Sequence, residues 1–340
     1  MKFSQMKKVL PILFILVVLV VAGIAAGKKN AEYQHDSGLV FGTSYNITYQ
    51  SNDNLKPEIE KVLADVDASL SPFNEKSVIT HVNRNEAVTL DDHFITVFRL
   101  SSEICKDTEG AFDITVAPLV NAWGFGFKNG TMPDKQAIDS LKQFVGFDKV
   151  KLQDGKIIKT DDRLMLDCSA IAKGYGVDAV AKMLKSKGIS NFMVEIGGEI
   201  VASGENPKGA PWRIGVSKPE DDSVSVSNDI QGIINISDKA MATSGNYRNF
   251  YYKGGKKYAH TIDPKTGCPV QHSILSATVV SDECAKADAY ATAFMVMGLE
   301  KAKAVLARHK DMMAYFIYSD DKGNNKVWYS PSLKANLEEK

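Results

Sequence analysis

The most informative stretch of this 340-residue chain is Cys284-Ala285-Lys286-Ala287-Asp288-Ala289-Tyr290-Ala291-Thr292-Ala293-Phe294-Met295-Val296-Met297. Nearly all of these side chains are small or apolar, which predicts a helix buried within the body rather than lying on its surface. Asp288 and Thr292 are four residues apart, so a helix places them one turn apart on the same face. The rest of the fold must therefore pack around a helix that carries two polar groups.

A buried carboxylate needs a cation or a set of hydrogen-bond donors. The pair Asp288 and Thr292 suits Mg²⁺, which takes one or two protein oxygens and keeps its other positions for water and substrate phosphate. The alternative is that Asp288 accepts hydrogen bonds from backbone amides of a neighbouring loop, while Thr292 bonds its own helix. This stretch alone leaves both interpretations open.

The overall charge and the cysteines restrict the function. The chain has 41 basic and 41 acidic side chains and no net charge, which argues against electrostatic capture of nucleic acid. Its four cysteines form no CxxC pair, which gives no support to a zinc site, and their pairing cannot be chosen from sequence. Neither nucleic acid nor zinc is expected as a partner.

Residues 1–29 are expected to form a membrane anchor or signal segment outside the globular body. The apolar run of residues 9–26 is just long enough to span a bilayer, and lysines flank it on both sides. The small residues 22–27 could also offer a cleavage site. The basic N-terminus favours retention of that end in the cytoplasm, so we expect an anchor in the cell inner membrane and a periplasmic, extracytoplasmic domain at residues 30–340.

The remaining sequence predicts one α+β body, with mixed, mostly antiparallel sheets and packed helices. No βαβ alternation, repeat or linker divides it. Helices are expected at residues 55–70, 94–108, 134–145, 170–187 and 299–309. Strands or hairpins are expected at residues 38–50, 149–160, 163–167, 191–196, 212–216, 230–236, 257–262, 276–280 and 313–329.

Two segments offer groups for a ring and for a phosphate. In residues 110–127 an aromatic side chain beside glycines and a carboxylate could stack on a planar ring, or could simply belong to a loop with core aromatics. Residues 167–176 join a strand to a helix start, where free amides and Lys173 could bind an anion. There the alternative is an ordinary helix cap, Asp167 or Ser169, with a solvated Lys173. No P-loop or dinucleotide-binding motif is present.

Two further segments supply a glycine pair and a histidine. Gly197 and Gly198 interrupt a strand, either as a plain turn or as a place where a flat ligand meets backbone. His260 is expected to close a strand just before a turn and could accept a proton from an attacking hydroxyl; alternatively it is a structural histidine.

Taken together, these stretches resemble the FAD:protein FMN transferases, the ApbE-type flavin transferases. The resemblance covers about residues 42–304 and extends to an ApbE/T-fold-like body. It rests on seven segments in the family's order: residues 41–43, Leu70-Ser71-Pro72-Phe73, residues 110–115, residues 167–174, Gly197-Gly198, residues 260–267 and residues 288–292. Phe41 stands where many relatives have methionine, and the absence of a cysteine after the apolar run places a lipid anchor in doubt.

The resemblance implies that FAD binds as substrate with Mg²⁺ at its diphosphate. FMN then passes through its phosphate to a Ser or Thr of an acceptor flavoprotein, expected in a membrane electron-transport complex, and AMP is released. By motif match the metal is held by Asp288, Thr292 and the backbone oxygen of Ala170, and His260 is the candidate base. The expected FAD contacts are Phe41, Phe73, Ala111, Phe112, Asp113, Asp167, Lys173, Gly197, Gly198 and Ile262.

Two other functions fit the same residues. A Mg²⁺-dependent FAD pyrophosphatase would use water in place of the acceptor hydroxyl. An exported flavin-binding protein without catalysis would need the flavin pocket, but would not need Asp288, Thr292 and His260 placed together.

Overall fold

The computed structural model describes residues 31–127, 132–219, 230–246, 250–253 and 256–338. The predicted anchor at residues 1–29 lies outside the described residues. In the part of the chain that is described, no helix is both long enough and apolar enough to cross a membrane.

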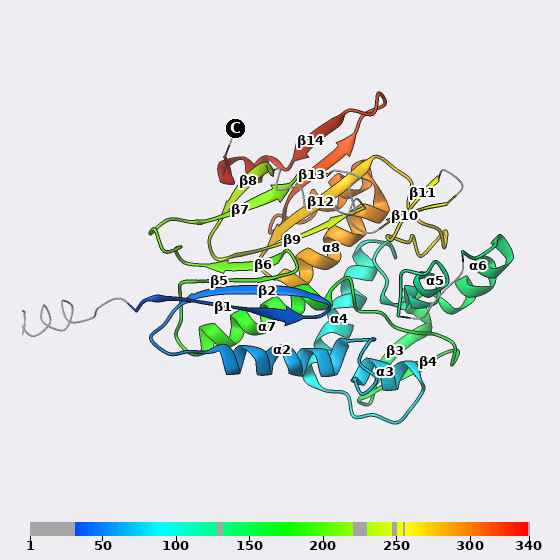
Figure 1. The fold of residues 1–340 in the computed structure, drawn as a ribbon. Helices are drawn as coiled ribbons and strands as arrows, with labels where there is room; N and C mark the ends of the chain where they lie inside the picture. The colour runs from blue at the N-terminus through cyan, green and yellow to red at the C-terminus, as the bar shows by residue number, and fades with distance from the viewer. Residues whose placement is uncertain (1–30, 128–131, 220–229, 247–249, 254–255, 339–340) are drawn as a thin grey trace, which may run out of the picture.

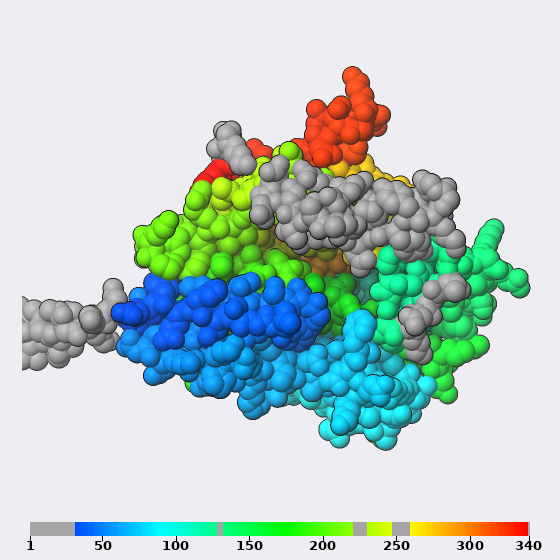
Figure 2. Space-filling view, viewed as in Figure 1, coloured from blue at the N-terminus to red at the C-terminus, as the bar shows by residue number. Residues whose placement is uncertain are grey.

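The centre of the fold is an antiparallel sheet of eight strands in the order β1-β2-β5-β6-β9-β12-β13-β14 (Figure 1). These strands are β1 Tyr33–Val40, β2 Thr43–Gln50, β5 Phe192–Ile196, β6 Glu199–Ser203, β9 Lys239–Gly245, β12 Ile274–Ser281, β13 Met313–Ser319 and β14 Asn325–Tyr329. The β13–β14 hairpin projects from the top of the body in Figure 2. The α+β fold with mostly antiparallel strands is thus confirmed.

Helices cover one face of this sheet. The described helices are α2 Lys56–Leu70, α3 Val78–Asn83, α4 Asp92–Asp107, α5 Ala117–Ala122, α6 Lys135–Leu141, α7 Ala172–Ser186, α8 Cys284–Met297 and α9 Leu299–Leu306. Helix α8 contacts β9, β12 and α7, and ten of its fourteen residues are buried. The predicted buried helix is therefore confirmed at its predicted bounds.

Smaller sheets complete the body. They are formed by β15 Leu337–Glu338, β8 Ile230–Ile236 and β7 Trp212–Ser217; by β3 Val150–Gln153 and β4 Lys156–Lys159; and by β10 Phe250–Lys253 and β11 Lys256–Ala259. A buried apolar cluster that includes Trp212, Ile234 and Tyr315 joins β7 and β8 to the large sheet. The large sheet thus has helices on one face and this small sheet on part of the other.

Hairpin turns occur where the turn residues predicted them. Asp154 and Gly155 both have positive φ between β3 and β4, and Gly197 and Gly198 have φ of 62° and 104° between β5 and β6. Backbone of this kind matches the twist of antiparallel strands and is easy for glycine. Each turn therefore fixes the register of its two strands.

Several boundaries differ from the prediction. Residues 163–167 form no strand, because the side chain of Asn83 binds both the N–H and the carbonyl of Leu166, at 2.7 and 2.8 Å, in place of a neighbouring strand. The helix expected at residues 134–145 ends at Leu141 and continues as a 3₁₀ turn. The strand expected at residues 257–262 ends at Ala259, and Ile262 makes only an isolated bridge to Pro269.

Two helices are also shorter than predicted, each by a few residues at one end. The helix expected from residue 170 begins at Ala172, and the one expected to end at residue 309 ends at Leu306. All four cysteines are free thiols.

Candidate active site

One large cavity brings the predicted site residues together. Its volume is about 1010 Å³, at the upper end of the ~300–1,000 Å³ usual for ligand pockets. Its lining includes every residue predicted for the site: Phe41, Phe73, Ala111, Phe112, Asp113, Asp167, Ala170, Lys173, Gly197, Gly198, His260, Ile262, Asp288 and Thr292. Residues as far apart in sequence as Phe41 and Thr292 thus meet around one space.

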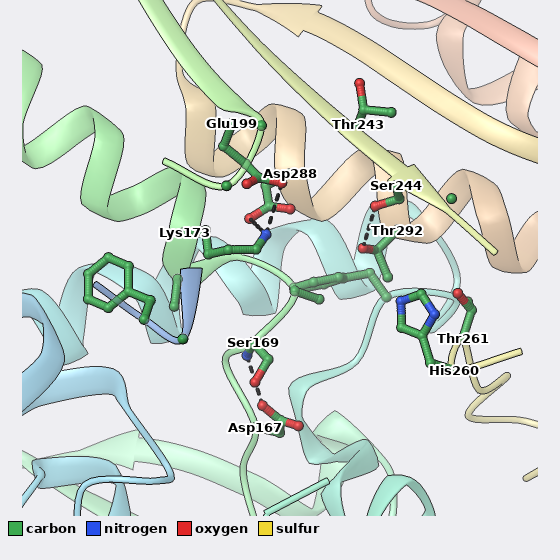
Figure 3. A pocket seen from close by; sticks show the side chains of 18 of the residues that line it. Asp167, Ser169, Lys173, Glu199, Thr243, Ser244, His260, Thr261, Asp288 and Thr292 are labelled. Carbon is green, nitrogen blue, oxygen red and sulfur yellow. Dashed lines mark hydrogen bonds and ion pairs between the residues drawn. The ribbon is translucent and has the colours of Figure 1, made fainter. Parts of the chain in front are cut away.

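Asp288 and Thr292 present their oxygens from α8 to this cavity (Figure 3). Asp288 is only 2% exposed, and its Oδ2 accepts a hydrogen bond of 3.1 Å from the Gly174 N–H. Thr292 Oγ1 shares a hydrogen bond of 3.1 Å with Ser244 Oγ on β9. Asp288 therefore does accept from a backbone amide, as the alternative required, whereas Thr292 points to a neighbouring strand.

The close crossing of α7 and α8 makes this contact possible. A Cβ on Gly174 would lie 2.5 Å from the carbonyl oxygen of Cys284 and 2.9 Å from Ala285 Cα. Only glycine leaves room for the two backbones at this separation. Gly174, in the first turn of α7 and within the predicted segment of residues 167–176, therefore serves helix packing as well as the cavity.

Lys173 is held between two carboxylates, not in solvent. Its Nζ lies 2.9 Å from Glu199 Oε1 and 3.8 Å from Asp288 Oδ2. Burial disfavours the ammonium, but Asp288 and Glu199 outweigh this and raise the pKa of Lys173 above its usual range. The interpretation of Lys173 as a solvated charge is therefore wrong.

Glu199 was not predicted for the site, although it follows the glycine pair directly. It is 3% exposed and lines the cavity at the start of β6. Burial raises the pKa of Glu199 above its usual range, in spite of the opposing charge of Lys173. The one local signal was a carboxylate beside two glycines in an otherwise apolar strand.

Two other carboxylates organise the loops around the cavity. Asp113 accepts from the Thr115 N–H and hydroxyl and from the Phe147 N–H, at 2.7–3.1 Å, and burial raises the pKa of Asp113. Asp167 accepts from the Ser169 N–H at 2.8 Å, and desolvation raises the pKa of Asp167. Helix α7 has Ile171 as its N-cap without a side-chain bond, so neither Asp167 nor Ser169 caps it.

His260 and several aromatic rings also line the cavity. The half-buried His260 follows β11, its ring lies edge-on to Phe125 at 6.4 Å, and its imidazole is turned toward the pocket (Figure 3). Phe73 is 70% exposed and lies edge-on to Phe127 at 6.3 Å. The phenylalanine rings offer a planar ligand an apolar contact near solvent.

Asp288 and Thr292 on α8, with Lys173 and Glu199 beside them, form one wall of the cavity, which we call the α8 wall. Its oxygens fit a divalent cation. No cluster of three or more His, Cys, Asp or Glu side chains suited to a metal occurs in the described ranges. Magnesium needs no such cluster, since one carboxylate plus neutral oxygens suffices when substrate phosphate and water complete its shell. The ammonium of Lys173 near Asp288 shows that this wall already accommodates a positive charge.

A large cavity lined both by polar, cation-accepting groups and by aromatic rings suits an anionic ligand that carries planar rings. Comparison with known proteins gives the family. Residues 41–317 match the ApbE family, so the chain belongs to the ApbE family.

Relatives cover nearly the whole chain. A protein from Vibrio cholerae named FAD:protein FMN transferase is 38% identical over 325 residues, spanning 92% of this chain and 96% of the relative. One of the same name from Haemophilus influenzae is 35% identical, spanning 91% and 93%. The solved structure of the flavin transferase ApbE from Vibrio cholerae superimposes with a TM-score of 0.81 at 37% identity, covering 90% of this chain and all of that one.

Proposed function

We propose that this ApbE-family flavin transferase moves FMN from FAD onto a Ser or Thr hydroxyl of an acceptor flavoprotein and releases AMP, with Mg²⁺ required. The observation that carries the proposal is that Asp288, Thr292 and Lys173 line one cavity together with His260 and aromatic rings. A flavin with a diphosphate needs both kinds of group, charged ones for its phosphates and aromatic ones for its rings.

The acceptor hydroxyl attacks the phosphorus of the FMN half of FAD. A new phosphoester P–O bond forms, the P–O bond to the AMP half breaks, and AMP leaves with the bridging oxygen. A hydroxyl is a weak nucleophile at neutral pH, so His260 accepts its proton as general base, a contribution of about 10²–10⁴-fold. The cavity walls hold donor and acceptor in line, which is the main task in phosphoryl transfer.

Mg²⁺, when bound by Asp288, Thr292 and the carbonyl oxygen of Ala170, supplies Lewis-acid stabilisation of negative charge on the phosphates. Lys173 adds a further positive charge on the same wall. Asp113 and Asp167, which hold their loops by backbone hydrogen bonds, position Ala111, Phe112 and the segment before α7 beside the FAD. Phe41, Phe73 and the backbone at Gly197, Gly198 and Ile262 complete the FAD contacts.

The cellular setting forms part of the proposal. The lysine-flanked apolar run at residues 9–26 supports an inner-membrane anchor, with the enzyme on the periplasmic side. Acceptors in that compartment are flavoproteins of membrane electron-transport complexes that present a Ser or Thr.

The test is incubation of the purified full-length protein with FAD, Mg²⁺ and a candidate acceptor carrying a flavinylation threonine. We expect covalent FMN on the acceptor by intact mass and in-gel fluorescence, matched by AMP release and abolished by chelator. AMP and free FMN without labelling, across several acceptors, would identify an FAD pyrophosphatase. Intact FAD throughout would identify a flavin-binding protein.

A further inference from the structure

The group formed by Lys173, Glu199 and Asp288 contains more charge than metal binding by Asp288 requires. The three side chains come from α7, from the start of β6 and from α8, and converge on one wall of the cavity (Figure 3). The ammonium is in hydrogen-bond contact with Glu199 at 2.9 Å, but lies 3.8 Å from Asp288, too far for a hydrogen bond. Glu199 is thus the first partner of Lys173.

One carboxylate oxygen of Glu199 is available to accept a further hydrogen bond. Its side chain is 4% exposed, and its second oxygen, Oε2, is buried without a hydrogen-bond partner among the described residues. A buried carboxylate oxygen without a donor is costly, so its retention calls for a reason. Lys173 offers one, because an ammonium carries three donors and one contact to Glu199 uses only one of them.

Lys173 has the longest and most exposed side chain of the three. Glu199 is fixed at the end of a two-glycine hairpin turn and Asp288 lies in the middle of a buried helix. The Lys173 side chain is 30% exposed and has a flexible four-carbon stem, so its ammonium can shift by an ångström or two.

We propose that Lys173 and the divalent cation compete for the position beside Asp288, and that Glu199 is a positioning residue that holds the ammonium when the cation binds. This inference rests on the proposed metal site. An ammonium within 4 Å of Asp288 repels a cation on the same carboxylate. Glu199 draws Lys173 away through both of its oxygens, so the site is cleared for the cation while the positive charge stays on the phosphate-binding wall.

The experiment measures Mn²⁺ binding to the full-length protein by electron paramagnetic resonance, without FAD and without turnover. Mn²⁺ favours the same carboxylate, carbonyl and water oxygens as Mg²⁺. K173M should bind Mn²⁺ more tightly than wild type. E199Q should bind it about tenfold more weakly or worse, because Lys173 then stays on Asp288 and repels the cation. The double variant K173M/E199Q should bind as K173M does, because without the ammonium the side chain at position 199 has nothing to hold away from Asp288.

The matched control is E195Q, on the preceding strand of the same hairpin. Glu195 also lines the cavity, but its two oxygens accept from Asn46 Nδ2 and the Gly198 N–H, and it makes no contact to Lys173. E195Q makes the same change in charge and should leave Mn²⁺ affinity within about twofold of wild type, as for a screened charge without a direct contact.

Three outcomes would overturn the inference. Equal weakening by E199Q in the wild-type and K173M backgrounds would make Glu199 act on the metal directly. Unchanged affinity in K173M would show that the ammonium does not compete, and this variant suffices if E199Q does not fold. Equal Mn²⁺ binding by wild type and D288N would remove the metal site itself, and with it the magnesium part of the proposed function.

Discussion

The α8 wall and the aromatic part of the cavity lining differ in how they are built. The α8 wall is buried and polar: Asp288 and Glu199 are 2% and 3% exposed, and each is tied to another element by a backbone amide or an ammonium. The aromatic part of the cavity lining is more open, with Phe73 70% exposed. Charged groups act strongly only where water is excluded and their positions are fixed, whereas ring contacts tolerate solvent. Substitutions on the wall should therefore cost far more than the removal of an exposed ring contact such as Phe73.

The largest effect is expected for D288N. Loss of this carboxylate removes the charged ligand proposed for the metal. The activation barrier for transfer should therefore rise by several kcal/mol, and the rate of transfer should fall about 10⁴-fold or more. The measurement is FMN incorporation into acceptor with and without chelator, with E195Q as the control for charge. A D288N protein that transfers FMN at the wild-type rate in chelator would show that the wall does not act through a metal.

H260A should come next. Turnover should slow by about 10²–10⁴-fold, while the Kd for FAD stays close to wild type, because His260 acts on the acceptor proton. Single-turnover transfer and flavin fluorescence quenching measure the two quantities separately. Weaker FAD binding with unchanged turnover would instead make His260 part of the flavin contact.

G174A tests the packing of the wall. Its Cβ would meet backbone atoms of Cys284 at 2.5 Å, which cannot move without separating α7 from α8, so we expect a loss of about 1–3 kcal/mol in the free energy of unfolding. G176A on the same helix is the matched control, because its Cβ would meet side chains and no backbone: the Phe41 ring at 2.6 Å and Ile196 Cδ1 at 3.7 Å. Urea denaturation should find G174A less stable than G176A, and equal stability would contradict the close crossing.

The smallest effect is expected for F73A. Removing one ring contact should weaken FAD binding by about 2–10-fold, the equivalent of about 0.5–1.5 kcal/mol, with no change in thermal stability. L39A is the control, since Leu39 is 86% exposed and does not line the cavity. If F73A weakened FAD binding as strongly as D288N slows transfer, the contrast between the buried α8 wall and the exposed aromatic lining would be wrong.

Local patterns predicted local structure well. Helix α8 has its predicted bounds, because fourteen residues without a breaker continue until Gly298 adopts a φ of 78°. The turns at Asp154-Gly155 and Gly197-Gly198 follow from backbone that glycine and aspartate adopt readily. The prediction of a strand at residues 163–167 was wrong. The segment has the pattern of a strand, but the side-chain amide of the distant Asn83 binds its backbone in place of a neighbouring strand.

The sequence alone therefore determined the buried helix, most hairpins and, through seven ordered segments, the family to which the chain belongs. Only the tertiary structure decided which charges share the wall. Lys173, Glu199 and Asp288 are separated by up to 115 positions and meet because α7 and α8 cross at Gly174 and β6 begins beside them. Helix and turn signals lie within a few residues of each other, whereas a contact across the fold depends on how whole elements pack. That is why the sequence predicted Asp288 and missed Glu199.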